Sequence, residues 1–358
     1  MRMAIQGIGV SGGFGCGVAD LRSALQSGAV APQQELVERG EKRDEFPLYR
    51  ATIDGLDEFF PKRALRRIDH FSKMTLLSAC LALKDAGLLE ADRARTGVVI
   101  ATGYGALKTT FDFLDSYLDF GYSCSSPTHF SNSVHNAAAA HVSMQLKATA
   151  PSLTVTQFEM SVPSALLTVQ QWLAEGRVDR VLFGCVDEYC QVLRYCRSQF
   201  FAAGEQGPLQ PFNFEQQSAV VGEGSVFFLL ASDSETATYA CIDSVRLGNH
   251  LANPIKLPQD DLLIVGADGH KECGRLYAPL LKGRSAAAYA PLYGSFPAAV
   301  GFDMAVAALS LAEQMHYPSP EQTGLSELVS EPLPLAEQQL SCLKFGPAGD
   351  YGLIRLSR

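Results

Sequence analysis

The sequence predicts an α/β protein, and three observations lead to that class. Short runs rich in β-branched residues alternate along the 358-residue chain with segments of helical periodicity. The residues are 47% hydrophobic and 19% charged, which is typical of a folded globular protein. α/β proteins of this length often form one compact unit made of two fused halves. We therefore expect alternating layers of helix and sheet.

Periodicity assigns the elements of the first half. Strands are predicted over 4–10, 96–103, 152–156 and 180–186, and helices over 18–27, 75–87, 109–120, 132–146 and 163–175. The second helix is apolar and ends at Gly87, a residue suited to a helix C-terminus. The third helix is amphipathic, with Phe113, Tyr117 and Phe120 on one face and three aspartates on the other.

The second half repeats this style in a shorter span. Strands are predicted over 224–232, 239–247, 262–269 and 351–358, and a helix over 302–315. The polar stretch 232–238 is the predicted connection between the halves. The segment 317–337 is rich in Pro, Ser and Glu and is predicted to be a surface loop.

Charge and cysteine content exclude several classes of function. The net charge of -9 and the isoelectric point near 5.3 argue against binding to nucleic acid or an anionic membrane. No stretch approaches the roughly 18 apolar residues of a membrane span, and the N-terminus does not read as a leader. The nine cysteines include no CxxC pair and indicate reduced thiols in a cytoplasmic protein. We predict no cofactor, and no metal at the irregularly spaced His129, His135 and His141.

Five segments, in this order, resemble the β-ketoacyl synthase family of condensing enzymes. They are "IQGIGVSGGFGCGV" (5–18), the helix over 66–88, "GRVDRVLFGCVDE" (176–188), "PFNFEQQSAVVGEGSVFFLL" (211–230) and "FGPAGDYGLIRLSR" (345–358). The resemblance implies the thiolase-like fold, in which two fused α/β halves form a layered αβαβα arrangement. We accordingly divide the chain into a half over 1–235 and a half over 236–358, within one compact unit.

The resemblance also implies which positions carry chemistry. That family condenses a thioester with a malonyl group on an acyl-carrier protein, using a cysteine thiolate, two histidines and a supporting lysine. On the matched segments the nucleophile falls on Glu159, the histidines on Asp268 and Ser295, and the lysine on Ala290. A phenylalanine that gates the acyl pocket falls on Pro347. We therefore predict no catalytic residues of the family type.

Glu159 and His270 each keep more than one interpretation. Glu159 is an inert charge at a helix N-terminus, a group that reaches a dimer interface, or a promoter of malonyl decarboxylation. His270 is a loop histidine or a displaced catalytic one. Cys185, inside a predicted strand, is a packed thiol. Cys190 and Cys196 flank a predicted loop and would be exposed there.

The predicted helix over 109–120 contains four aromatic residues. Phe111, Phe113, Tyr117 and Phe120 recur at spacings typical of a core-facing stripe. In heterodimeric members of the family this region lies at the interface of the two chains and bounds the tunnel of the growing product. The group is therefore either core or, with Glu159, part of an interface.

These expectations favour a chain-length-factor-like subunit without independent activity. It would pair with an active β-ketoacyl synthase, meet the acyl-carrier protein through that complex, and shape the tunnel in which a polyketide or aryl polyene chain grows. Two alternatives stay open. One is a malonyl-carrier-protein decarboxylase that uses Glu159 or Asp268, and the other is a homodimeric acyl-binding protein.

Overall fold

The computed structural model describes all residues except 40–41, 201–207, 233–236, 259–261, 321–331 and 336–338. Within these residues one continuous sheet of 11 strands runs through the molecule. Its first half contains β1 (Met3–Gly12), β9 (Gly224–Ala231), β7 (Arg180–Asp187), β5 (Thr96–Thr102) and β6 (Ser152–Thr156), in that order. β1, β9 and β7 are antiparallel, whereas β7, β5 and β6 are parallel.

The second half of the sheet continues from β1. It contains β10 (Cys241–Asn249), β16 (Asp350–Ser357), β15 (Gln339–Phe345), β11 (Leu262–Val265) and β12 (Ala286–Ala287). The halves join where Met3 and Ala4 of β1 pair with Ile242 and Cys241 of β10. The strands of the two halves therefore lie on either side of the predicted boundary at 235/236, which itself stays a prediction because residues 233–236 are not described.

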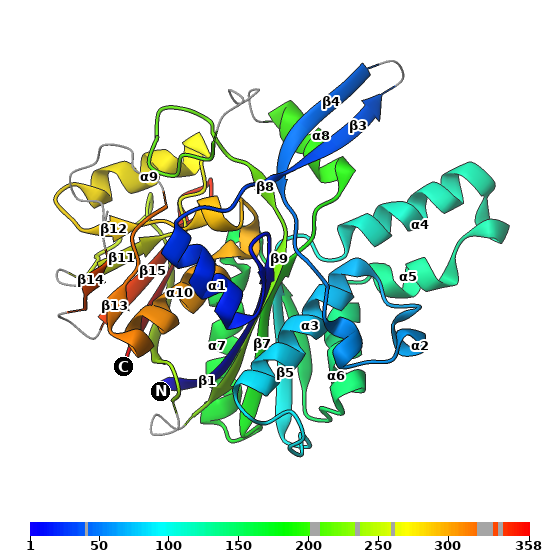
Figure 1. Cartoon of the computed structure of the whole chain (residues 1–358), viewed down its shortest axis with the longest axis horizontal. Helices are drawn as coiled ribbons and strands as arrows, with labels where there is room; N and C mark the ends of the chain where they lie inside the picture. The colour runs from blue at the N-terminus through cyan, green and yellow to red at the C-terminus, as the bar shows by residue number, and fades with distance from the viewer. Residues whose placement is uncertain (40–41, 201–207, 233–236, 259–261, 321–331, 336–338) are drawn as a thin grey trace.

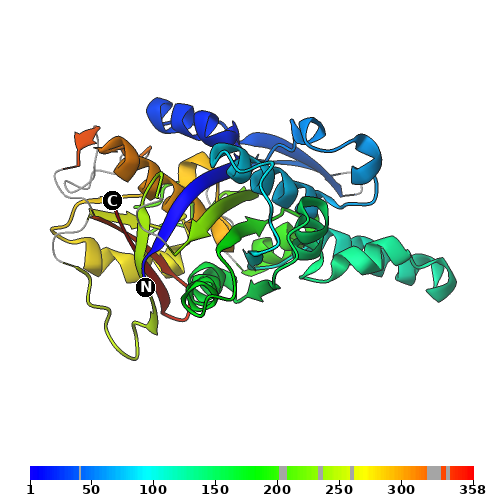
Figure 2. The same cartoon turned by 90° about the horizontal axis from the view of Figure 1, so that it is seen from below.

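Helices separate and cover the two sheet halves (Figures 1 and 2). α3 (His70–Asp85) and α6 (Ala137–Leu146) pack on the first half, and α9 (Lys271–Leu281) packs on β15 of the second. α7 (Ser161–Ala174) and α10 (Val300–Glu313) lie between the halves and contact strands of both. The layers are thus α, β, α, β, α, and the predicted thiolase-like arrangement is confirmed.

The central position of α10 follows from its sequence. All its residues from Val300 to Leu311 are buried, as expected for a helix that is apolar on every side. Two charged or polar exceptions within this stretch, Asp303 and Ser310, are buried as well. A buried carboxylate requires a partner, and Asp303 finds one near the candidate site.

Two features project from this body (Figure 1). The first is an arm formed by α4 (Leu107–Phe120) and α5 (Pro127–Ser133), which pack on each other; we call residues 107–133 the arm. The second is the hairpin of β3 (Gln33–Arg39) and β4 (Lys42–Tyr49), which pairs with β8 (Val221–Gly222) beside α8 (Gln191–Phe200). Figure 2 shows the arm extending away from the layers.

Shorter elements complete the chain. They are β2 (Gly15–Cys16), α1 (Gly17–Ser27), η1 (Leu56–Glu58), α2 (Lys62–Leu65), η2 (Tyr122–Cys124), η3 (Phe158–Met160), η5 (Ala290–Leu292), η6 (Pro297–Ala299), β13 (Met315–His316) and β14 (Leu333–Pro334). No helix of the described residues is both long and apolar enough to cross a membrane.

Most predicted elements are confirmed, but some local expectations are wrong. The helix over 132–146 is broken, because Val134 adopts an extended conformation between α5 and α6. The segment 317–337 is not surface at its start, since Tyr317 is buried, and its residues 321–331 and 336–337 lie outside the described chain. The predicted connection 232–238 lies largely outside it too.

The loop predicted around Cys190 is also wrong. Cys190 is buried and directly precedes α8, and Cys196 is half-buried within that helix. Cys185 is fully buried in β7, and burial raises its pKa well above the ordinary value of a thiol, as expected for a packed cysteine.

Candidate functional site

The positions that the family resemblance singled out come from distant parts of the chain and meet at one pocket. Glu159 lies in η3, directly before α7, and Asp268 follows β11. Ser295 lies between η5 and η6, and Pro347 lies in the turn between β15 and β16. All four line the pocket, which we call the central pocket, together with His270 of the turn before α9.

Ala290, the fifth position, is not part of this lining. It is buried in η5, where its carbonyl accepts a hydrogen bond from Gly294 at 2.7 Å. No ammonium group therefore enters the site from this position. The aromatic residues of α4 also lie elsewhere, on the arm.

The central pocket is small, and aromatic and proline side chains wall it. Its volume is about 60 Å³, which holds a few water molecules but no acyl chain. Tyr104, Phe296 and Pro297 complete the wall beside Pro347. The ring of Tyr104 contacts Phe158 edge-on, with centroids 5.8 Å apart.

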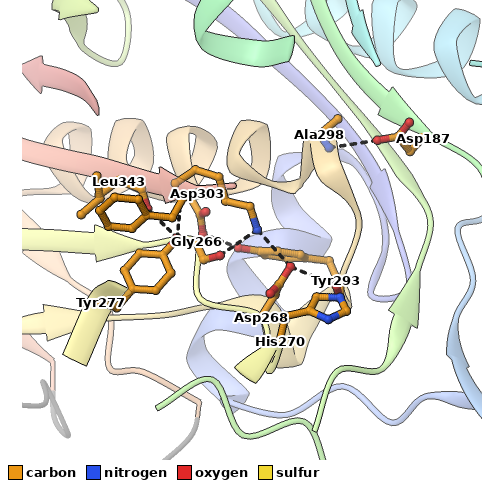
Figure 3. A network of polar contacts seen from close by, with 12 residues as sticks. Asp187, Gly266, Asp268, His270, Tyr277, Tyr293, Ala298, Asp303 and Leu343 are labelled. Atoms are coloured by element: carbon orange, nitrogen blue, oxygen red, sulfur yellow. Dashed lines mark hydrogen bonds and ion pairs between the residues drawn. The ribbon is translucent and has the colours of Figure 1, made fainter. Parts of the chain in front are cut away.

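A buried carboxylate holds two of these walls together. Asp187, at the end of β7, accepts hydrogen bonds from the backbone amides of Gly103 and Tyr104 at 2.9 and 3.1 Å, and from that of Ala298 at 2.9 Å. Burial raises the pKa of Asp187 to about 6, although these donors and Thr102 oppose the shift. The loop after β5 is thereby fixed to η6, as Figure 3 shows for the Ala298 bond.

The backbone in front of Glu159 is strained. Phe158 has a φ of 46°, a left-handed conformation that costs a bulky residue about 1 kcal/mol or more. The turn is held by Ser161, whose hydroxyl donates to the carbonyl of Thr102 at 2.8 Å and accepts from the amide of Gln157 at 2.7 Å. This turn places Glu159 at the start of α7, at the mouth of the central pocket and near Gly346.

A lysine does enter this region, but from an unexpected strand. Lys344 of β15 is buried, and its Nζ lies 2.9 Å from Oδ2 of Asp268 and donates to the carbonyl of Gly266 at 2.8 Å. Although burial disfavours its charged form, the nearby Asp268, Cys273 and Glu159 raise the pKa of Lys344 above its ordinary value. Asp268 also accepts a hydrogen bond from Ser295 at 2.9 Å. Lys344 and Ser295 thus both bind Oδ2 of Asp268.

A second buried carboxylate lies behind this pair. Asp303 of α10 accepts a short hydrogen bond from the hydroxyl of Tyr293. Burial raises the pKa of Asp303 to about 7, with Tyr293 and Lys344 opposing the shift. Lys344 and Asp303 could have been found in the sequence, because each is a single charge inside an apolar run, "CLKF" and "GFDMAV". A charge in such a run requires a buried partner.

One thiol lines the central pocket without the properties of a nucleophile. Cys273 lies in the first turn of α9, where its thiol is almost completely buried. Burial, followed by the charge of Asp268, raises the pKa of Cys273 to about 12. Because the thiolate is the reactive species, Cys273 does not replace the missing family nucleophile.

The histidines that the sequence analysis named have different surroundings. His270 precedes α9 and its Nδ1 lies 3.0 Å from Nε2 of Gln217. His135 is exposed, and Nε2 of His141 lies 3.1 Å from Oδ1 of Asn132, with burial lowering the pKa of His141. His129 lines a different pocket, at the base of the arm.

The aromatic stripe of α4 is not core. Thr109 is the sole residue of this helix that is buried, and Tyr117 and Phe120 are 49% and 69% exposed. Phe111 and Phe113 are half-buried, and the ring of Phe113 packs against Phe130 of α5 at 5.3 Å. The core interpretation is therefore wrong for the end of the stripe, because α4 leaves the body and packs chiefly on α5, with further contacts to η2 and α8.

Comparison with known proteins places the chain in a family. The model of the β-ketoacyl synthase N-terminal domain matches residues 4–236, and the chain belongs to the β-ketoacyl synthase family. It is 23% identical over 241 residues to a 3-oxoacyl-[acyl-carrier-protein] synthase 2 of Synechocystis, covering 64% of this chain and 57% of that protein. It is 23% identical over 188 residues to a 3-oxoacyl-[acyl-carrier-protein] synthase 2 of Mycobacterium tuberculosis, covering 51% and 45%. The chain thus spans less than two thirds of these relatives.

Solved structures share the fold over the whole chain. A β-ketoacyl synthase from Burkholderia phymatum superposes with a TM-score of 0.83 at 15% identity, covering 100% of this chain and 99% of that one. A ketosynthase in complex with its chain length factor from Xenorhabdus doucetiae gives 0.80 at 15%, covering 99% and 97%. The ishigamide ketosynthase/chain length factor gives 0.80 at 17%, covering 99% and 98%. These identities establish the fold.

Proposed function

We propose that this chain is a non-catalytic, chain-length-factor-like subunit of a cytoplasmic heterodimer. Its partner would be an active β-ketoacyl synthase that meets the acyl-carrier protein, and together they would elongate a polyketide or aryl polyene chain. The observation that carries the proposal is Glu159 at the start of α7, on a pocket whose single lining thiol is held neutral. A carboxylate there forms no useful thioester, so the acyl chain must be held by another protein chain.

The state of the other polar groups in the central pocket supports this proposal. Lys344 is committed to Asp268, and Ser295 donates to the same carboxylate. Condensation needs groups that interact with a developing enolate, whereas these groups already satisfy one another. The pocket of about 60 Å³ also leaves no room for a substrate chain.

An exposed apolar face supports the pairing. Ten large apolar side chains between residues 114 and 158 are exposed; they are Leu114, Tyr117, Leu118, Phe120, Tyr122, Phe130, Val134, Met144, Leu153 and Phe158. They come from the arm, from the link between the arm and α6 (Val134), and from α6, β6 and η3. α5 contacts α6, and α6 contacts β6. We call these ten residues the apolar face. Such a concentration is typical of a surface that another protein covers.

The edge of the sheet at β6 also supports pairing with a second chain. β6 ends the sheet order and pairs with β5 alone among the described strands. An uncovered edge strand with apolar neighbours is a template for pairing with a second chain. Two of the similar solved structures contain a ketosynthase together with its chain length factor. A ketosynthase is therefore the candidate for that second chain.

Co-expression tests the proposal directly. We would express the chain with an intact ketosynthase encoded beside its gene, and measure the mass of the eluting species by light scattering after size exclusion. We expect a stable 1:1 complex and a chain that associates poorly with itself. A well-behaved homodimer that ignores the ketosynthase would refute the pairing.

One alternative has an observation in its favour. Glu159 shares the central pocket with His270, so a carboxylate and an imidazole are available to a malonyl group in a malonyl-carrier-protein decarboxylase. Release of carbon dioxide from malonyl-loaded carrier protein by the purified chain, lost in Glu159→Ala, would support it. The homodimeric acyl-binding alternative receives less support, because the central pocket is too small for a long acyl chain.

A further inference from the structure

A second pocket lies where the arm leaves the body. Its volume is about 200 Å³, and it is lined from the segment before α3, from α4, from α5 and from the end of β7. It shares no lining residue with the central pocket. We call it the arm-root pocket. The proposed function makes no use of the arm-root pocket.

The floor of this pocket contains a buried carboxyl group with one unused oxygen. Glu188 is 1% exposed, and its Oε1 accepts a hydrogen bond from the backbone amide of Lys108 at 2.9 Å. Its Oε2 is buried without a hydrogen-bond partner. Burial, and then the neighbouring Asp69 and Glu223, raise the pKa of Glu188 well above the ordinary value. Because Oε1 accepts from Lys108, the protonated form of this carboxyl has its O–H on Oε2.

The other carboxylates of the arm-root pocket are already engaged. Asp69 caps α3, accepting from the amide and the hydroxyl of Ser72, both at 2.9 Å. Asp112 lies 2.6 Å from Nζ of Lys108 in an ion pair one helical turn apart. These contacts hold the two side chains in place, but the charge of Asp69 still acts inside the pocket, where it raises the pKa of Glu188.

The positive groups at its rim are not engaged in this way. Arg66 and Arg67 are exposed, and neither guanidinium forms an ion pair within the described residues. His129 lines the pocket from α5, and its Nδ1 is buried without a partner. In a chain of net charge -9 this is a local excess of hydrogen-bond donors around one cavity. A buried polar atom without a hydrogen-bond partner is unfavourable, and a ligand with oxygen atoms would supply that partner.

We propose that the arm-root pocket binds a small oxyanion of the phosphate class, either free or as the phosphate group of a monoester. Arg66 and Arg67 would supply charge-assisted hydrogen bonds at the rim, and His129 and Glu188 would donate to the oxygens from inside. The volume accommodates a phosphate group with a small substituent. The ligand would touch α5 and the body at once, and so fix the arm. This inference does not rest on the proposed function.

Calorimetric titration of the full chain with inorganic phosphate tests the inference, at constant ionic strength set with chloride. We expect saturable binding that Arg66→Ala/Arg67→Ala weakens at least 10-fold. The matched control is Lys62→Ala/Arg63→Ala, which removes the same charge from the same segment at residues that do not line the pocket. Binding by this control should stay within about twofold. Methyl phosphate in place of phosphate distinguishes a monoester site, where it binds at least as tightly, from a site for the free ion.

Variants at Glu188 examine the inner donor. Glu188→Gln keeps the shape and a donor group, and we expect it to bind within about threefold of the unchanged chain. Glu188→Leu removes the donor and should weaken phosphate binding at least 10-fold. If this variant does not fold, the titration of Arg66→Ala/Arg67→Ala decides the outcome. The inference is overturned by the absence of saturable heat with both phosphate and methyl phosphate. Equal weakening in the two double variants would also overturn it, since it would mean unspecific attraction.

Discussion

The central pocket and the apolar face differ in what they leave unsatisfied. In the pocket, Lys344, Asp268 and Ser295 pair with one another, and the nearby thiol stays protonated. On the face, side chains such as Tyr117 and Phe120 remain in contact with water. The site that would carry chemistry in the family is thus closed on itself, whereas the surface beside β6 is open. This difference supports the proposal that the chain associates with a partner.

Breaking the pocket's ion pair should have the largest effect. Lys344→Met leaves Asp268 buried without its cation, and we expect the free energy of unfolding to fall by about 3–5 kcal/mol. Urea denaturation measures it. The double variant Lys344→Met/Asp268→Leu removes both charges and should recover most of the loss. If the single variant is as stable as the unchanged chain, the pair does not hold the pocket closed.

Changes on the apolar face should affect association and leave folding alone. Tyr117→Ala and Phe120→Ala should each weaken the ketosynthase complex by about 2 kcal/mol, or about 30-fold in Kd, while the stability of the isolated chain changes by less than about 0.5 kcal/mol. Leu251→Ala is the matched control, since Leu251 is 69% exposed in the second half, outside that face. Surface plasmon resonance and thermal melting separate the two effects. Equal weakening by the control would argue against this face as the interface.

The buried Asp303 predicts a pH dependence of stability. Its pKa in the folded protein, about 7, is above the ordinary value of 3.8, so the folded state binds more protons between these values. Its contribution is therefore fully present below about pH 4 and is lost as the pH rises to about 7, at no more than about 1.4 kcal/mol per pH unit. Asp303→Asn should remove this part of the slope when unfolding free energies are compared at pH 5 and pH 7. An unchanged slope would contradict the buried, protonated state.

The smallest effect concerns the packing of the arm. Phe113→Ala removes the ring contact with Phe130, and we expect a loss of about 1 kcal/mol in stability. If the arm bounds the tunnel of the partner, the same variant should give a longer product in the reconstituted complex, because a large side chain is removed. Mass spectrometry of the products measures the length. A normal product from a stable complex would confine Phe113 to packing.

The sequence predicted most of the architecture because period and composition are local. The strand over 152–156 matches β6 at both ends, and the helices over 18–27, 75–87 and 163–175 correspond to α1, α3 and α7. Strands β3, β4 and β15 and the helix α8 were not predicted. β15 contains Lys344, and a charge inside a short apolar run weakens the strand pattern.

The candidate site was predicted as a set of positions and not as a set of contacts. The resemblance of segments to the family predicted the positions Glu159, Asp268, Ser295 and Pro347. The fold places all four on one pocket. The replacement of the supporting lysine by Ala290 suggested that no ammonium remains, yet Lys344 enters from β15. Position in the chain does not reveal which strand will deliver a long side chain to a given point.

By itself, the sequence determined the α/β class of the fold, because that class depends on residue types and on spacings of two or about 3.6 residues, which are written along the chain. The order of the layers and the nucleophile position at Glu159 came from the resemblance of whole segments to the β-ketoacyl synthase family. Only the tertiary structure decided that Lys344 pairs with Asp268, that the aromatic stripe of α4 projects into solvent, and that Glu188 keeps an unused oxygen beneath the arm. The physical reason is that burial and pairing depend on neighbours distant in sequence, which no local pattern encodes.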